Sequence, residues 1–123
     1  MNLKKLGLAV ISAQLVAYAA WAHHSHGAYA MTDYTEIDGV VTEVYWINPH
    51  AWVYLDVENE AGEIENWALE AAGATTLSRA GLSEDTVQSG DRIHVRCHPL
   101  RDGSNGCLLG YVTTEDGTEV LWD

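Results

Sequence analysis

The sequence predicts an all-β domain with one short helix, closed into a five-stranded barrel. Five segments rich in β-branched and aromatic residues alternate with turns that contain glycine, proline, asparagine or aspartate. A single short helical pattern stands between the third and the fourth of these segments. Five strands with a helix in that position follow the order of an OB-type barrel.

The first half of the chain predicts three strands. The first covers residues 37–48, with Gly39 as a bulge, and Pro49 ends it because proline cannot continue a central strand. Residues 50–57 alternate between two faces, with His50, Trp52, Tyr54 and Asp56 on the polar one. A turn at ENEAGE and a third strand over residues 64–70 complete a hairpin.

The second half predicts the helix and the remaining strands. Apolar spacing favours a helix over residues 74–81, which Gly81 stops. A turn at SGD leads to a fourth strand over residues 92–98, and the loop HPLRDGSNG leads to a fifth over residues 107–114. A last turn precedes the short final stretch EVLW.

Residues 1–22 have the pattern of a signal peptide. Lys4 and Lys5 precede an apolar run of about 16 residues, which ends in the small-x-small sequence Ala20-Trp21-Ala22. The run is short for a membrane span of about 20 residues, although an uncleaved anchor is the alternative. We therefore expect a periplasmic or secreted protein with a His-rich arm over residues 23–35 and one domain over residues 36–123.

The mature chain would be strongly acidic. It keeps four arginines against 18 acidic residues, a net charge of −14 with neutral histidines. Such a chain repels nucleic acid and anionic membrane surfaces and attracts cations. Solubility alone is the other explanation of this charge.

The two cysteines, Cys97 and Cys107, each lie five residues from Asp102. A hairpin centred on Asp102 would set them opposite each other, and export permits a disulfide. The spacing favours a disulfide over free thiols or a thiolate pair for a soft metal.

Histidines gather at the places where an OB-type barrel binds ligands. His50 and His98 stand at the two loops that border the usual ligand face. The arm carries His23, His24 and His26, and its 13 residues reach up to about 43 Å, longer than the roughly 36 Å of the first strand.

Cleavage after Ala22 would place a free α-amine on His23, so that one residue offers two nitrogen ligands. A further imidazole from His24, His50 or His98 completes a set that suits copper(II), with zinc as the alternative. Asn48 and Asp102 are candidates for orienting the imidazoles. The competing interpretation is an unstructured histidine tail with adventitious metal affinity.

Two other functions stay open. Trp52 and Tyr54 share a face with His50 and would form a binding platform for a small molecule, a glycan or a protein, with Arg101 contacting an anionic group. The second of these functions is an interaction protein that binds a periplasmic protein partner through an exposed sheet edge. The sequence lacks a nucleophile elbow, a phosphate loop, an EF-hand loop and an HExxH motif. Catalysis would therefore rest on a copper site, as in a small copper oxidase.

The strings AHHSHGAY, GVVTEVYWINPHAWVYLDV, NWALE and HPLRDGSNG resemble a family of small exported bacterial proteins of unknown function. The resemblance covers residues 23–120 and implies an OB-type barrel behind a signal peptide. It implies no reaction. The positions that match the family pattern are His23, His24, Ser25, Asn48, Pro49, His50, Trp52, Trp67, His98, Arg101 and Asp102. Cys97 and Cys107 are not part of that pattern.

Overall fold

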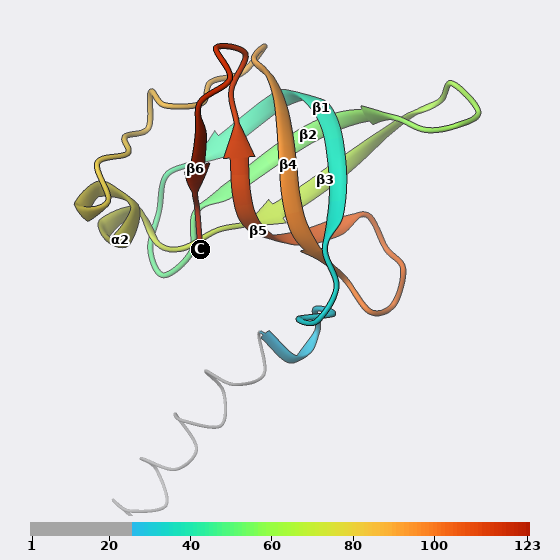
Figure 1. The fold of residues 1–123 in the computed structure, drawn as a ribbon, viewed down its shortest axis with the longest axis horizontal. Coiled ribbons are helices and arrows are strands. Elements are labelled where there is room, and N and C mark those ends of the chain that lie inside the picture. The colour runs from blue at the N-terminus through green and yellow to red at the C-terminus, as the bar shows by residue number, and fades with distance from the viewer. Residues whose placement is uncertain (1–25) are drawn as a thin grey trace, which may run out of the picture.

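The computed structural model describes residues 26–123 and confirms a mainly β fold with a short helix after the third strand (Figure 1). The signal peptide predicted over residues 1–22 lies outside this range, as do His23 and His24. The elements are β1 (Thr35–Tyr45), β2 (Trp52–Glu58), β3 (Ile64–Glu70), α2 (Ala74–Arg79), β4 (Arg92–Pro99), β5 (Gly106–Thr113) and β6 (Glu119–Leu121). None of the helices in the described residues is long and apolar enough to cross a membrane.

The strands close into the predicted OB-type barrel. Their order is β3-β2-β1-β4-β5-β6, with antiparallel neighbours. A parallel pairing of β3 with β5, from Ala68 opposite Gly106 to Glu70 opposite Leu108, joins the two ends of the five-stranded sheet. β6 extends the other half of β5. In Figure 1 the β2–β3 hairpin projects to one side of the barrel, and α2 lies on the opposite side.

The bulge predicted at Gly39 is wrong, because the register of β1 against β2 shifts between Val41 and Glu43. Gly39 serves a different purpose. A Cβ atom there would lie 2.9 Å from the Asp56 carbonyl oxygen and 3.2 Å from the Leu55 Cβ atom. Glycine therefore lets β1 lie close against β2 where the sheet bends.

The inner faces of the strands form one apolar core. Val53 and Leu55 are fully buried, as the alternation of β2 predicts. Trp122, the penultimate residue, is 1% exposed and packs edge-on against Trp46 with ring centroids 6.2 Å apart. Its backbone N–H donates to Gly110, and its carbonyl accepts from Ala72. The C-terminal end of the chain is thus part of the core.

The predicted disulfide is confirmed. Cys97 on β4 and Cys107 on β5 are bonded, with Cα atoms 5.6 Å apart, and both are fully buried. They belong to the inner face, so the bond joins neighbouring strands at the base of the β4–β5 loop.

The N-terminal segment, residues 26–34, lies against the barrel. Tyr29 forms an isolated β-bridge with Leu100, and the Arg101 N–H donates to the Ala28 carbonyl at 2.9 Å. The Ala30 N–H donates to the Pro99 carbonyl, also at 2.9 Å. This part of the predicted arm is therefore bound beside the β4–β5 loop, and Figure 1 shows it below the barrel.

Candidate functional site

A row of four side chains crosses the outer face of the barrel. Trp52 on β2 pairs with Glu70 on β3, Glu70 pairs with Leu108 on β5, and Leu108 pairs with His98 on β4. Directly paired residues share a face, and strands about 4.8 Å apart give this row a length of roughly 14 Å. The row lies between the β1–β2 and β4–β5 loops, which border the ligand face of OB-type barrels.

Tyr29 covers the middle of this row. Its hydroxyl donates to Glu70 Oε2 at 2.6 Å, and both side chains are about 5% exposed. Burial raises the pKa of Tyr29 far above its ordinary value of 10.0, and the hydrogen bond to Glu70 raises it further. The phenol therefore remains a neutral donor to the carboxylate.

His50 is held on the other oxygen of the same carboxylate. Its Nδ1 lies 3.1 Å from the Ala71 carbonyl oxygen and 3.3 Å from Glu70 Oε1. A carbonyl oxygen only accepts, so the Ala71 contact assigns the proton to Nδ1 and leaves the lone pair on Nε2. The His50 side chain is 35% exposed, whereas Glu70 is buried.

The buried carboxylate of Glu70 has no permanent positive partner in the part of the chain that the structure describes. Within residues 26–123, the ion pairs include no lysine or arginine at Glu70, and His50 is its single basic neighbour within 4 Å. A buried anion is stable only when it is paired and hydrogen-bonded. Among the described residues, the Tyr29 hydroxyl and the His50 imidazole are therefore the groups that face this carboxylate.

His98 holds the N-terminal segment. Its Nδ1 lies 2.7 Å from the Asp33 carbonyl oxygen, and its ring packs on Tyr34 with centroids 4.2 Å apart. It stands at the far end of the row from Trp52, two strand spacings from Glu70. His26 is exposed at the start of the described chain. Among residues 26–123, no three His, Cys, Asp or Glu side chains form a group that could hold a metal ion.

Asn48 and Asp102 each hold a loop. Asn48 bonds Thr75 in the first turn of α2, with its amide donating to the hydroxyl and its carbonyl accepting from the backbone N–H. Asp102 accepts hydrogen bonds from the Ser104 hydroxyl and N–H, which lower the pKa of Asp102. Their role in orienting an imidazole stays a prediction.

An aromatic patch lies beside His50 on the outer face of β1 and β2. Tyr45 pairs with Trp52 across the strands, is 48% exposed and packs edge-on against Tyr54 at 5.6 Å. Ile47, in the following loop, is 50% exposed. Arg101, which was predicted to contact an anionic group on this face, instead contacts the N-terminal segment, where its Nε donates to the Tyr29 carbonyl at 2.9 Å.

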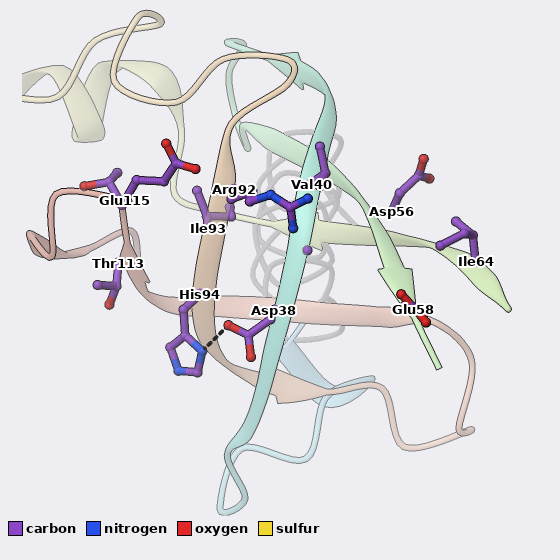
Figure 2. Close-up of a pocket in the computed structure, with 12 residues that line it drawn as sticks. Asp38, Val40, Asp56, Glu58, Ile64, Arg92, Ile93, His94, Thr113 and Glu115 are labelled. Carbon is purple, nitrogen blue, oxygen red and sulfur yellow. Dashed lines mark hydrogen bonds and ion pairs between the residues drawn. The ribbon is translucent and has the colours of Figure 1, made fainter. Parts of the chain in front are cut away.

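A separate groove of about 740 Å³ lies on the outer side of β1 and β4 (Figure 2). Figure 2 shows His94 pointing to Asp38, and its Nδ1 lies 2.9 Å from the Asp38 carboxylate. The lining includes Val40, Arg92 and the carboxylates Asp38, Asp56, Glu58 and Glu115. His94 is thus paired with surface carboxylates and lies outside the row described above.

Sequence reasoning missed Glu70 and Tyr29. Glu70 is the last residue of β3, and an acidic residue at the end of a strand is predicted to face solvent. Tyr29 stands in a stretch without periodicity, and it meets Glu70 across 41 residues of sequence. The one available signal is the position of Glu70 opposite Trp52, which places it on the predicted ligand face once the hairpin register is known.

The fold and this row of side chains define a small OB-type barrel whose outer face is partly covered by its own N-terminal segment. The chain belongs to a family of unknown function, DUF6152, whose model matches residues 10–109. This agrees with the resemblance to small proteins of unknown function. No curated protein and no solved structure matches the chain significantly.

Proposed function

We propose that this protein is an exported copper(II)-binding protein whose role is to bind or deliver the ion, with no turnover. His50 supplies one ligand from the barrel. His23, through its α-amine and imidazole, and His24 supply the others, and His98 or His26 serves as an auxiliary ligand. Zinc is the competing ion.

The observation that carries this proposal is the setting of His50. Metal-binding histidines almost always donate their other ring N–H to a carboxylate or a backbone carbonyl, which fixes the tautomer and makes the free nitrogen more basic. The Ala71 carbonyl accepts from His50 Nδ1, and Glu70 Oε1 lies 3.3 Å from the same nitrogen. The nitrogen left for a ligand is Nε2, on a side chain that is 35% exposed.

The position of Tyr29 supports a contribution from the chain start. Tyr29 is hydrogen-bonded to the same carboxylate as His50. His23 lies six positions before Tyr29 in the sequence, a stretch that spans at most about 20 Å. Amine and imidazole nitrogens suit copper(II), which heads the divalent affinity order. The buried disulfide is compatible with an oxidising compartment.

The test is a copper(II) titration of protein purified from the periplasm, with its N-terminus established by mass spectrometry. His50→Gln is compared with His94→Gln. His94 is the matched control, because its side chain is equally exposed, at 33%, and its Nδ1 also contacts a carboxylate. We expect tight one-to-one binding that His50→Gln weakens at least tenfold and His94→Gln leaves unchanged.

A variant with one extra residue before His23 tests the terminal amine separately. We expect it to bind copper more weakly than the wild type, because the amine no longer forms a chelate ring with the His23 imidazole. Equal affinity in the wild type, the extended variant and His50→Gln would refute the proposed site. Binding should also weaken on acidification, because the amine and imidazoles ligate only when deprotonated.

The aromatic patch favours a second candidate, a binding module for a glycan or another small molecule. Exposed Tyr45 beside Trp52 and Tyr54 offers flat apolar surface at the ligand face of the barrel. A glycan array probed with the wild type and with Trp52→Ala tests it. Binding lost in Trp52→Ala and kept in His50→Gln would support this function over the metal site.

A further inference from the structure

We propose that docking of the N-terminal segment and cation binding at His50 stabilise each other through Tyr29 and Glu70, an inference that rests on the proposed function. Tyr29 and Glu70 are positioning residues in this arrangement. Neither needs to contact the cation, because each acts through the imidazole of His50.

A single buried carboxylate connects the two events. Glu70 Oε2 accepts from the Tyr29 hydroxyl at 2.6 Å, and Oε1 faces His50 Nδ1 at 3.3 Å. Each oxygen has one of the two partners, so a rotation of the carboxylate that improves one contact changes the other. When Tyr29 departs, Oε2 loses its donor, and the carboxylate no longer has a fixed orientation toward His50.

The segment itself is held by few contacts outside this pair. Its other attachments include the backbone bonds beside Leu100, the bonds from Arg101 and His98 to carbonyls of the segment, and the contacts of the Tyr34 ring with His98 and Gly110. Tyr29 supplies the buried side chain of the segment, whereas Tyr34 is 54% exposed. Segments with little buried apolar surface open at low free-energy cost, so ligand binding can shift their population.

A cation on His50 Nε2 would favour the docked segment for an electrostatic reason. A cation on Nε2 would bring positive charge close to Glu70, whose Oε1 lies 3.3 Å from Nδ1 of the same ring. The carboxylate would then be held more firmly in the orientation in which its Oε2 accepts from the Tyr29 hydroxyl. The coupling is reciprocal by linkage, so the docked segment raises the affinity for the cation by the same factor.

The experiment measures copper(II) affinity, by competition with a chelator, in the wild type, Tyr29→Phe and Tyr34→Phe. Tyr34→Phe is the matched control, because it removes one hydroxyl from the same segment, and that hydroxyl lies beside Gly110. We expect Tyr29→Phe to weaken binding about tenfold, or about 1.4 kcal/mol. Tyr34→Phe should bind like the wild type. Glu70→Gln should lose at least tenfold, as substitutions of such outer partners do.

Hydrogen exchange of residues 26–34 in the wild type, with and without saturating copper(II), tests the linkage without any variant. We expect the ion to slow exchange in this segment. Unchanged exchange, or equal affinity in Tyr29→Phe and the wild type, overturns the linkage while leaving copper binding intact. A wild type that binds no copper overturns the proposed function and this inference together.

Discussion

Reduction of the disulfide should destabilise the barrel by a calculable amount. Cys97 and Cys107 are ten residues apart, and the bond restricts this loop in the unfolded chain. The chain-entropy model gives about 2.7 kcal/mol for a loop of that length. Reduction removes no heavy atom from the core and truncates no side chain, so the comparison of oxidised with reduced wild type reports mainly on the cross-link.

The assay is equilibrium unfolding in urea, followed by tryptophan fluorescence with and without a reductant. With an m value of about 1.5 kcal/mol per molar urea, the unfolding midpoint should fall by about 1.8 M on reduction. The double variant Cys97→Ala/Cys107→Ala should lose more stability, because both cysteines are fully buried in the core and their truncation leaves unfilled space. A midpoint shift below about 0.5 M on reduction would refute the reasoning, since the cross-link would then contribute under about 1 kcal/mol.

Three further predictions follow from the packing. Trp122→Ala should cost about 4 kcal/mol in urea unfolding, because it empties a fully buried aromatic site at the C-terminal end, and intact stability would contradict that role. Because the pKa of Tyr29 is raised in the folded state, its contribution to stability is complete below pH 10 and is lost as the pH rises further. The free energy of unfolding should therefore fall more between pH 9 and 11 in the wild type than in Tyr29→Phe. Gly73→Ala should lower the melting temperature, because its Cβ atom would lie 2.5 Å from the Pro49 carbonyl oxygen. In the control Gly27→Ala the added Cβ atom has no neighbour within 4 Å, so this variant should melt like the wild type.

Local patterns were sufficient to predict most of the fold. The alternation along β2 buries Val53 and Leu55, and the predicted third strand, residues 64–70, matches β3 in both bounds. A strand with one buried face carries its burial pattern in its own sequence, because side chains alternate with a period of two. The disulfide could also be predicted from the ten-residue separation of the two cysteines. The predicted register was wrong, because Cys97 pairs with Leu109 and Cys107 with Pro99 instead of with each other.

Contacts between segments that are distant in the sequence could not be predicted from local patterns. The bulge lies between Val41 and Glu43 because β1 must bend to pair with both β2 and β4, a requirement of the closed barrel. The local sequence around Trp122 predicts only the end of a short strand. The site that its side chain fills in the core exists only once the other strands are assembled. The Tyr29–Glu70 bond likewise depends on where the segment before β1 meets the completed sheet.

The course of the N-terminal segment restricts which ligands the outer face can take. In OB-type barrels, oligonucleotides and oligosaccharides lie across this face between the two bordering loops. Here Tyr29 covers Glu70 in the middle of the row, and Tyr34 packs on His98 at its end. A polymer on that path would have to displace both tyrosines and leave Glu70 without its donor. A small ligand at His50 would require no such displacement, because Nε2 is the ring nitrogen that neither Glu70 nor the Ala71 carbonyl contacts. The covered face therefore disfavours a chain-like ligand and leaves the patch of Tyr45 and Trp52 as the more open surface beside it.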